Sequence, residues 1–318
     1  MSNPRTSGLR TSDLRASDLQ ASLHGLWLPL ITPFRDGALD EASLRRLVRH
    51  YAALPINGLV LAATTGESLT LSPEETERLV FAVRDEAGKT RNLPVLLGLS
   101  GSNTTALSDT LERTASWPID GYLVSCPYYS RPSQQGLELH FRALAGRAAH
   151  PVALYNIPYR TGVNLGNEAM LSLAHHPNIV GLKDCCADRD QSLELLRRRG
   201  QNFAVLTGED AQYHDALADG ADGGILASAH VETEIFAEIY QLQAAGEHDA
   251  AMARWRSVAG LTRLLFAEPS PAPIKHWLWR TGLIDSAEVR LPMTGVSAEL
   301  AARVDREIER RAVPSSPG

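Results

Sequence analysis

Lysine is scarce in this chain, and one lysine stands where it can do chemistry. Of the 31 Lys and Arg residues, only Lys89, Lys183 and Lys275 are lysine. Lys183 ends the segment 179–183, whose apolar residues are typical of a buried strand. Burial lowers the pKa of an ammonium group, and the neutral amine can attack a carbonyl carbon to form an imine. The sequence therefore indicates Schiff-base chemistry, while an ion pair of Lys183 with Asp184 or Glu209 remains the structural alternative.

Strand alternation gives Lys183 a partner. It assigns Val180 and Leu182 to one face of the strand and Lys183 to the other, which points into a barrel if the bulky pair faces the helices. In the preceding strand segment, 151–155, the same alternation turns Tyr155 inward. A phenol beside an imine can transfer protons while the imine forms. A packed core tyrosine with a satisfied hydroxyl is the alternative.

A third segment, 63–67, follows another predicted strand with the sequence Ala-Thr-Thr-Gly-Glu. Thr64 and Thr65 offer adjacent hydroxyl groups, and the turn offers backbone donors suited to a small carboxylate. The turn is a weak signal alone. Together with Lys183 and Tyr155 at the carboxyl ends of strands, it predicts a site.

These residues need a scaffold, and the chain supplies a regular one. Eight apolar segments of strand length lie at 26–34, 58–63, 94–100, 121–127, 151–158, 179–185, 203–209 and 223–228. Amphipathic stretches with helix start signals separate them, including the Ser72-Pro73-Glu74-Glu75 capping box and helices at 103–116, 133–148 and 188–199. Eight such units predict an α/β fold, a closed (β/α)₈ TIM barrel. An open doubly wound sheet would place a glycine-rich G-x-G-x-x-G after the first strand, which instead ends in Thr32-Pro33-Phe34.

The domain organisation follows from these boundaries. Residues 1–22 form a loose polar repeat and are expected to be a flexible tail outside the barrel. Residues 23–233 form the barrel. Residues 234–318 supply the last barrel helix, a C-terminal helical bundle with helices at 259–268, 272–282 and 297–311, and a short tail.

Composition excludes several classes of function. The formal charge of −6, without a strong basic stretch, argues against a nucleic-acid partner. Three cysteines and ten histidines form no zinc or other metal spacing, so no metal is expected. No apolar run approaches the roughly 18 residues of a membrane span, and a cytoplasmic location is expected.

Over residues 24–311 the chain resembles the dihydrodipicolinate synthase / N-acetylneuraminate lyase family of class I aldolases. The segments that carry the resemblance are TTGES (64–68), CPYYSRPSQQG (126–136), YNIPYRTG (155–162), GLKD (181–184), TGEDA (207–211), GGILASAH (223–230) and EPSPAPIK (268–275). The resemblance implies that Lys183 forms an imine with pyruvate and that Tyr155 transfers protons. It implies a proton relay through Thr64, with Tyr129 reaching a neighbouring subunit's site. Thr65 would bind the pyruvate carboxylate, and Gly208 and Ile225 match backbone positions around the imine.

Arg160 selects a branch of the family. In members that condense pyruvate with L-aspartate 4-semialdehyde, the arginine of the Y-N-x-P-x-R-T-G motif binds the semialdehyde carboxylate, and a guanidinium suits that role. The resemblance thus implies synthesis of 4-hydroxy-tetrahydrodipicolinate for lysine and diaminopimelate biosynthesis, without a cofactor, in a homo-oligomer that is a dimer of dimers. An arginine that only fixes its loop is the alternative for Arg160.

Two other functions stay open. Cys185-Cys186, Asp184, Tyr159 and Ala63 depart from the family pattern, which keeps a 2-keto-3-deoxy sugar-acid aldolase or dehydratase in view. The cysteines are expected to fill the core. A non-catalytic binding barrel is the alternative from a different class, and the presence of Lys183, Tyr155, Thr64 and Arg160 argues against it.

Overall fold

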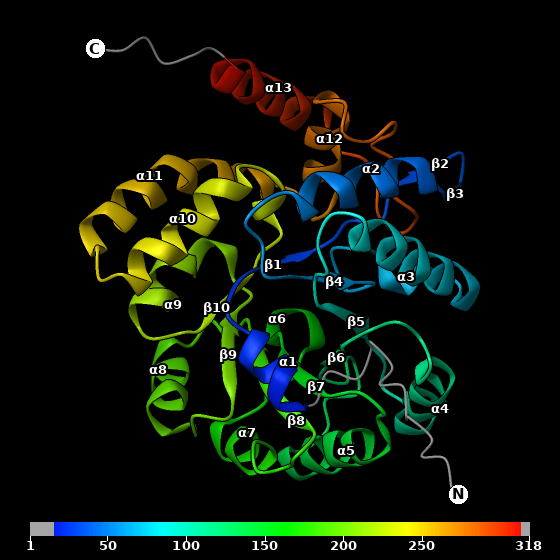
Figure 1. The fold of residues 1–318 in the computed structure, drawn as a ribbon, viewed down its shortest axis with the longest axis vertical. Helices are drawn as coiled ribbons and strands as arrows, with labels where there is room; N and C mark the ends of the chain where they lie inside the picture. The colour runs from blue at the N-terminus through cyan, green and yellow to red at the C-terminus, as the bar shows by residue number, and fades with distance from the viewer. Residues whose placement is uncertain (1–15, 313–318) are drawn as a thin grey trace, which may run out of the picture.

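A closed parallel barrel forms the centre of the computed structural model, which describes residues 16–312 (Figure 1). Around the barrel the strands are β1 (Gly25–Pro29), β10 (Gly223–Ile225), β9 (Ala204–Thr207), β8 (Ile179–Asp184), β7 (Val152–Asn156), β6 (Gly121–Ser125), β5 (Val95–Leu99) and β4 (Gly58–Leu61), and β4 pairs with β1. The eight predicted strands are confirmed. All eight end earlier than predicted at their carboxyl ends, because apolar residues there continue into loops. After β1, for example, the chain turns into the antiparallel pair β2 (Phe34–Arg35) and β3 (Ala38–Leu39).

Helices cover the outside of the barrel. They are α2 (Glu41–Ala52), α3 (Pro73–Gly88), α4 (Thr104–Thr114), α5 (Gln134–Arg147), α7 (Asn167–Leu173), α8 (Arg189–Arg198), α9 (Tyr213–Ala218) and α10 (Thr233–Ala244). The short helix α6 (Pro158–Thr161) instead lies directly after β7, at the mouth of the barrel. Short 3₁₀ turns η1 (Ser68–Thr70), η2 (Asp210–Gln212) and η3 (Ser228–His230) follow strands. The predicted capping box is confirmed: the Glu75 amide donates to the Ser72 hydroxyl at 3.2 Å and the Ser72 amide donates to the Glu75 carboxylate at 3.0 Å.

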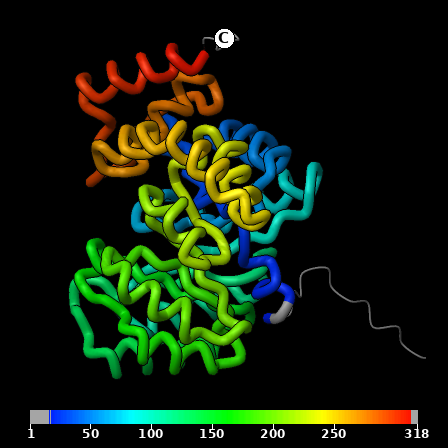
Figure 2. The backbone as a smooth tube through the Cα atoms, turned by 90° about the vertical axis from the view of Figure 1, so that its left-hand side faces the viewer, coloured from blue at the N-terminus to red at the C-terminus, as the bar shows by residue number. Residues whose placement is uncertain are grey.

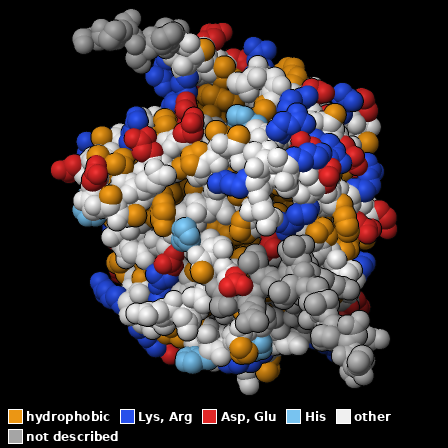
Figure 3. All heavy atoms as spheres, viewed as in Figure 1, with side chains coloured by type: hydrophobic (Ala, Val, Ile, Leu, Met, Phe, Trp, Pro, Cys, Tyr) orange, Lys and Arg blue, Asp and Glu red, His pale blue; other side chains and the backbone are white. Residues whose placement is uncertain are grey.

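The C-terminal extension consists of α11 (His248–Leu265), α12 (Ala272–Arg280) and α13 (Ala298–Ala312). The predicted helices at 272–282 and 297–311 are confirmed, whereas the one expected at 259–268 is the end of the longer α11. In Figures 1 and 2, α12 and α13 stack at the end of the molecule that holds α2. Ion pairs join α2 to α3, such as Arg45–Asp85 at 2.5 Å, and Figure 3 shows basic and acidic side chains interspersed there. None of the helices within residues 16–312 has the length and apolar character needed to cross a membrane.

Two layers of apolar side chains make up the core. The larger lies between strands and helices, and the smaller fills the barrel with residues that include Trp27, Val60, Leu96, Leu123 and Leu206. Strand alternation predicted that Val180 and Leu182 share the outer face, and this is wrong for Val180. The pairing of β7 with β8 skips one residue, so Ile179 pairs with Val152 and Gly181 with Ala153. Val180 is the extra residue of this bulge and packs in the inner cluster.

The amino terminus differs from the expected polar tail. Residues Ala16–Ser22 form helix α1, which contacts β8. Leu19 is fully buried and Leu23 is 1% exposed, and both join the inner barrel cluster. We call Leu19 and Leu23 the plug. A Cβ atom at Gly121 would lie only 2.5 Å from Leu19, so a glycine there makes room for the plug. The remainder of the predicted tail, 1–15, lies outside the described residues.

Candidate active site

Lys183 and Tyr155 lie side by side inside the barrel. They are register partners on the neighbouring parallel strands β8 and β7. Lys183 is 6% exposed and Tyr155 is 5% exposed. The Lys183 Nζ atom lies 4.5 Å from the centroid of the Tyr155 ring. The inward orientation that the sequence predicted for both residues is therefore confirmed.

The surroundings of Lys183 favour its neutral form. Burial lowers the pKa of the lysine, although the acidic side chains of Asp210 and Glu209 oppose the shift. The neighbouring Cys185 thiol is also buried, which raises its pKa well above the usual range and keeps it protonated. The ion pairs of the described residues include Lys89 and Lys275 but not Lys183, so the alternative of a structural salt bridge to Asp184 or Glu209 is not what the structure contains.

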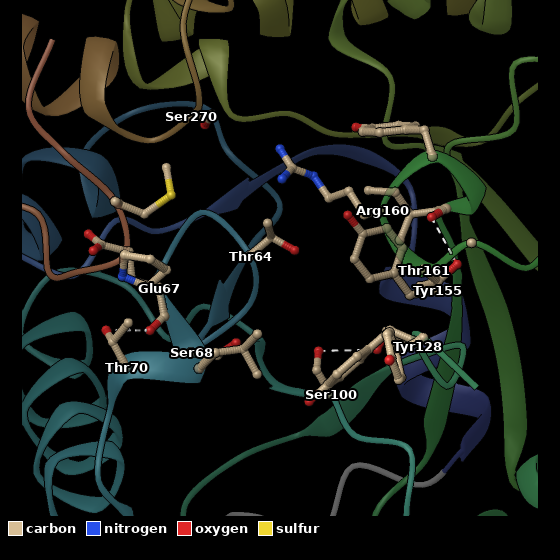
Figure 4. Close-up of a pocket in the computed structure, with 18 of the residues that line it drawn as sticks. Thr64, Glu67, Ser68, Thr70, Ser100, Tyr128, Tyr155, Arg160, Thr161 and Ser270 are labelled. Atoms are coloured by element: carbon tan, nitrogen blue, oxygen red, sulfur yellow. Dashed lines mark hydrogen bonds between the residues drawn. The ribbon is translucent and has the colours of Figure 1, made fainter. Parts of the chain in front are cut away.

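The Tyr155 hydroxyl is equipped to donate and return a proton. Burial raises its pKa well above that of a free phenol, and the neighbouring Thr64 side chain opposes the shift. Thr64 comes from the loop after β4, on the opposite side of the barrel mouth. Figure 4 shows Thr64 and Tyr155 facing each other across the pocket. A second hydroxyl pair, Ser125 to Ser100 at 3.1 Å, lies in the same pocket.

A cavity of about 690 Å³ opens above these residues. Of the eight residues singled out from the sequence, four line it: Thr64, Tyr129, Tyr155 and Arg160. The other four, Lys183, Thr65, Gly208 and Ile225, are not among its lining residues. Lys183 lies next to this lining, because its Nζ atom is 4.5 Å from the centroid of the Tyr155 ring.

Gly208 and Ile225 belong to the layer around the lysine. Ile225 is 1% exposed and lies in the inner barrel cluster with Tyr155 and Cys185. A Cβ atom at Gly208 would lie 2.3 Å from Lys183 Cε and 2.5 Å from Cys185 Sγ. The lysine stem therefore requires glycine at 208. Thr65 is also buried, at 7% exposure, in the turn next to Thr64.

Arg160 reaches the cavity from α6, directly after β7. Its guanidinium carbon lies 5.5 Å from the centroid of the Tyr159 ring. Burial raises the pKa of the Tyr159 phenol to about 12, and the positive charge of Arg160 opposes this shift. The arginine is exposed and lines the pocket, which leaves its cationic face available to an anion.

Tyr129 is an exposed residue at the edge of the cavity. It is 93% exposed and has a positive φ of 69°, although its amide donates to the Thr161 carbonyl at 3.1 Å.

Two groups of residues lie at the site although the sequence did not predict a role for them there. Glu209 and Asp210 follow β9, and burial, together with Asp210, raises the pKa of Glu209 to about 7. Asp210 accepts hydrogen bonds from the Ser228 amide and hydroxyl, both at 2.6 Å. The segment TGEDA was recognised only as a motif. The C-terminal extension was predicted only as a helical bundle, yet Ser270, Pro271, Pro292 and Met293 line the cavity.

The cysteines and possible metal ligands complete the description. Cys185 and Cys186 are buried, at 1% and 7% exposure, as core-filling residues would be. Within residues 16–312, His, Cys, Asp and Glu side chains form no group of three or more that could hold a metal ion.

With this geometry in hand, comparison with known proteins decides the family. Residues 22–311 match the model of the dihydrodipicolinate synthetase family. The chain belongs to this family. It is 41% identical over 284 residues to 4-hydroxy-tetrahydrodipicolinate synthase 2 of Clostridium acetobutylicum, covering 89% of this chain and 99% of that one.

Solved structures of the dihydrodipicolinate synthetase family share the whole fold. Dihydrodipicolinate synthase from Aquifex aeolicus superposes with a TM-score of 0.87 at 30% identity, covering 92% of this chain and all of that one. The chloride-inhibited enzyme from Acinetobacter baumannii, complexed with pyruvate, gives a TM-score of 0.86 at 31% identity, covering 90% of this chain and 98% of that one. This confirms the predicted barrel with its C-terminal helical extension and the predicted class I lyase.

Proposed function

We propose that this protein condenses pyruvate with L-aspartate 4-semialdehyde to give 4-hydroxy-tetrahydrodipicolinate, a step of lysine and diaminopimelate biosynthesis. One observation carries the proposal. A desolvated lysine is the register partner of a buried tyrosine, and the two lie beneath a cavity that an arginine lines. The names of the relatives agree with this reaction.

Each site residue has a role in the proposed reaction. Neutral Lys183 attacks the keto carbon of pyruvate, and loss of water gives the imine. Tyr155 and Thr64 move the protons that this step requires. Removal of a methyl proton gives an enamine, whose carbon attacks the semialdehyde carbonyl. The adduct then cyclises through the substrate's own amine, which releases Lys183. The lysine imine is the electron sink, so the reaction needs no metal or organic cofactor.

Substrate carboxylates are assigned to two places. Thr65, in the turn after β4, is proposed to bind the carboxylate of pyruvate, with Gly208 and Ile225 around the imine. Arg160 is proposed to bind the carboxylate of the semialdehyde, because it faces the cavity from the opposite side to Thr64 (Figure 4). A guanidinium can hold a carboxylate with two parallel hydrogen bonds.

The active form is proposed to be a dimer of dimers in the cytoplasm. The support for assembly is Tyr129, which is exposed and held in a left-handed backbone conformation beside the cavity mouth. In a dimer this side chain would enter the neighbouring site and complete its relay. Mixing Tyr129→Phe with Lys183→Ala subunits should then restore activity through hybrid sites, and a fully active monomer in sedimentation would contradict the assignment.

Borohydride trapping tests the chemistry. Reduction in the presence of pyruvate should add a lactyl-type mass to the peptide that contains Lys183. Lys183→Ala should show no adduct and lose activity by on the order of 10⁴-fold or more. Lys183→Arg should also be inactive, since arginine supplies no neutral amine. Adduct formation that persists in Lys183→Ala would falsify the assignment, and a panel of aldehydes offered to the wild type would reveal a sugar-acid aldolase instead.

A further inference from the structure

A cluster of charged residues lies buried between the barrel and the C-terminal extension. Lys275, on α12, is fully buried and pairs with the Glu67 carboxylate. Its Nζ atom also donates to the Glu288 carbonyl at 2.8 Å and lies 4.3 Å from the centroid of the Phe34 ring. The Arg290 guanidinium lies 4.1 Å from the centroid of the same ring. The mechanism described above uses none of these residues.

Glu67 connects this cluster to the catalytic turn. It lies three residues after Thr64, and its amide donates to the Thr64 carbonyl at 3.1 Å. Its φ of 54° is left-handed, a conformation that a side chain disfavours and that its surroundings must therefore maintain. One carboxylate oxygen pairs with Lys275, and the other accepts the Arg290 amide at 2.9 Å. A single side chain thus ties the turn to two parts of the extension.

The tied segments form part of the cavity wall. Pro292 and Met293, just after Arg290, line the cavity together with Thr64 and Glu67. Figure 4 shows Glu67 and Ser270 on the Thr64 side of the pocket, across from Tyr155. The Arg290 side chain is fixed in turn by Glu75, at 2.6 Å, and by the Thr70 carbonyl, at 2.9 Å.

Charge makes the pair sensitive to replacement. Burial lowers the pKa of Lys275 to about 8, while Glu67 opposes the shift, so the lysine remains mostly an ammonium at neutral pH. Glu67 is 5% exposed. Removal of either partner leaves a buried charge without its counterion, which is strongly destabilising. Removal of both partners leaves no unpaired charge and is therefore much less destabilising.

We infer that Lys275 and Glu67 are positioning residues for the reaction, which hold the turn 64–67 so that the Thr64 side chain keeps its place facing Tyr155. The inference rests on the proposed function. Its rival is a purely structural pair that only fastens the extension. The two differ in what the double replacement does, because the double replacement removes the tether without leaving an uncompensated charge.

The test compares Lys275→Met, Glu67→Gln and the double variant. Urea unfolding gives the stability of each, and single-turnover borohydride trapping gives the rate at which the pyruvate adduct forms. The single variants should lose stability and rate together. The double variant should regain most of its stability, while its trapping rate stays about 10- to 100-fold below wild type, as expected for a misplaced catalytic group.

Asp285→Asn is the matched control. Asp285 joins the extension to α2 through Arg46 at 2.5 Å and to β2 through Arg35 at 3.3 Å, and it has no bond to the turn 64–67. This variant should lose stability with less than a twofold change in trapping rate. A double variant that regains stability and traps pyruvate as fast as wild type would overturn the inference. A wild type that traps no pyruvate would refute the proposed function instead.

A second variant keeps the question answerable if the double variant does not fold. Glu67→Asp retains both charges but shortens the arm by one methylene, so the turn must shift to keep the pair. Its trapping rate should fall about tenfold, with little change in the unfolding midpoint. An unchanged rate would show that the turn does not depend on this tether.

Discussion

The two ends of the barrel carry different side chains. At the carboxyl end, Lys183, Tyr155 and the acidic pair after β9 gather around a cavity. At the amino end, Leu19 and Leu23 close the interior with apolar surface. Each end uses a glycine in the same way: Gly208 makes room for the lysine stem and Gly121 for Leu19. The comparison separates residues that serve chemistry from residues that serve stability, and replacements at the two ends should have opposite signatures.

Tyr155→Phe should have the largest effect on catalysis at the carboxyl end. Loss of the hydroxyl removes the proton donor next to Lys183, so the rate of adduct formation should fall on the order of 10³-fold. Urea unfolding should change little, because the ring remains packed. Trapping kinetics at saturating pyruvate would measure the effect. A rate within a few-fold of wild type would remove Tyr155 from the relay.

Arg160→Ala should affect only the second substrate. A bidentate charged hydrogen bond contributes about 3 kcal/mol, so kcat/KM for the semialdehyde should fall roughly 10²-fold while pyruvate trapping is spared. Steady-state assays with both substrates varied would separate the two. Equal use of the semialdehyde by the variant and the wild type would argue for a different aldehyde.

Leu19→Ala should show the opposite signature at the amino end. Loss of a fully buried leucine should destabilise the protein by about 2–4 kcal/mol, because it leaves a cavity under the barrel. Catalysis should change less than twofold at a temperature where the variant remains folded. Urea unfolding together with trapping kinetics tests both halves. A large loss of rate in fully folded Leu19→Ala would mean that the plug also shapes the site.

Glu209→Gln should show how much the buried carboxylate of Glu209 lowers the free energy of unfolding. Burial and Asp210 raise the pKa of Glu209 to about 7, above its ordinary value of 4.5. The folded state therefore binds this proton more tightly than the unfolded state. Its contribution to stability is full below about pH 4.5 and is lost as pH rises to about 7. The free energy of unfolding of the variant, relative to that of the wild type, should accordingly rise by about 1–2 kcal/mol between pH 5 and pH 8. This energy is discounted for the partial exposure of Glu209. A constant difference across that range would contradict the shift.

The fold and much of the site could be predicted from the sequence because their signals are local. Apolar runs gave the eight strands, and alternation gave the inward direction of Lys183 and Tyr155. The inward orientation of Val180 could not be predicted, because a bulge depends on the pairing of two strands and not on either strand alone. Helix α1 could not be predicted, because its sequence is short and polar. Its packing depends on the contact of Leu19 with Gly121, about a hundred residues away in the chain. Lys275 and Glu67 are also distant in the chain, and only the folded extension brings them together.

The arginine-rich surface has a practical consequence for peptide mapping. Among the three lysines, only Lys89 presents a well-exposed side chain, at 57%, while Lys183 and Lys275 are buried. A protease that cuts after lysine would divide the denatured chain into four fragments, 1–89, 90–183, 184–275 and 276–318. A reduced pyruvate adduct on Lys183 would block the second cut and leave one fragment spanning 90–275. The digest therefore reports how much of Lys183 carries the adduct: fragments 90–183 and 184–275 disappear, and fragment 90–275 appears in their place.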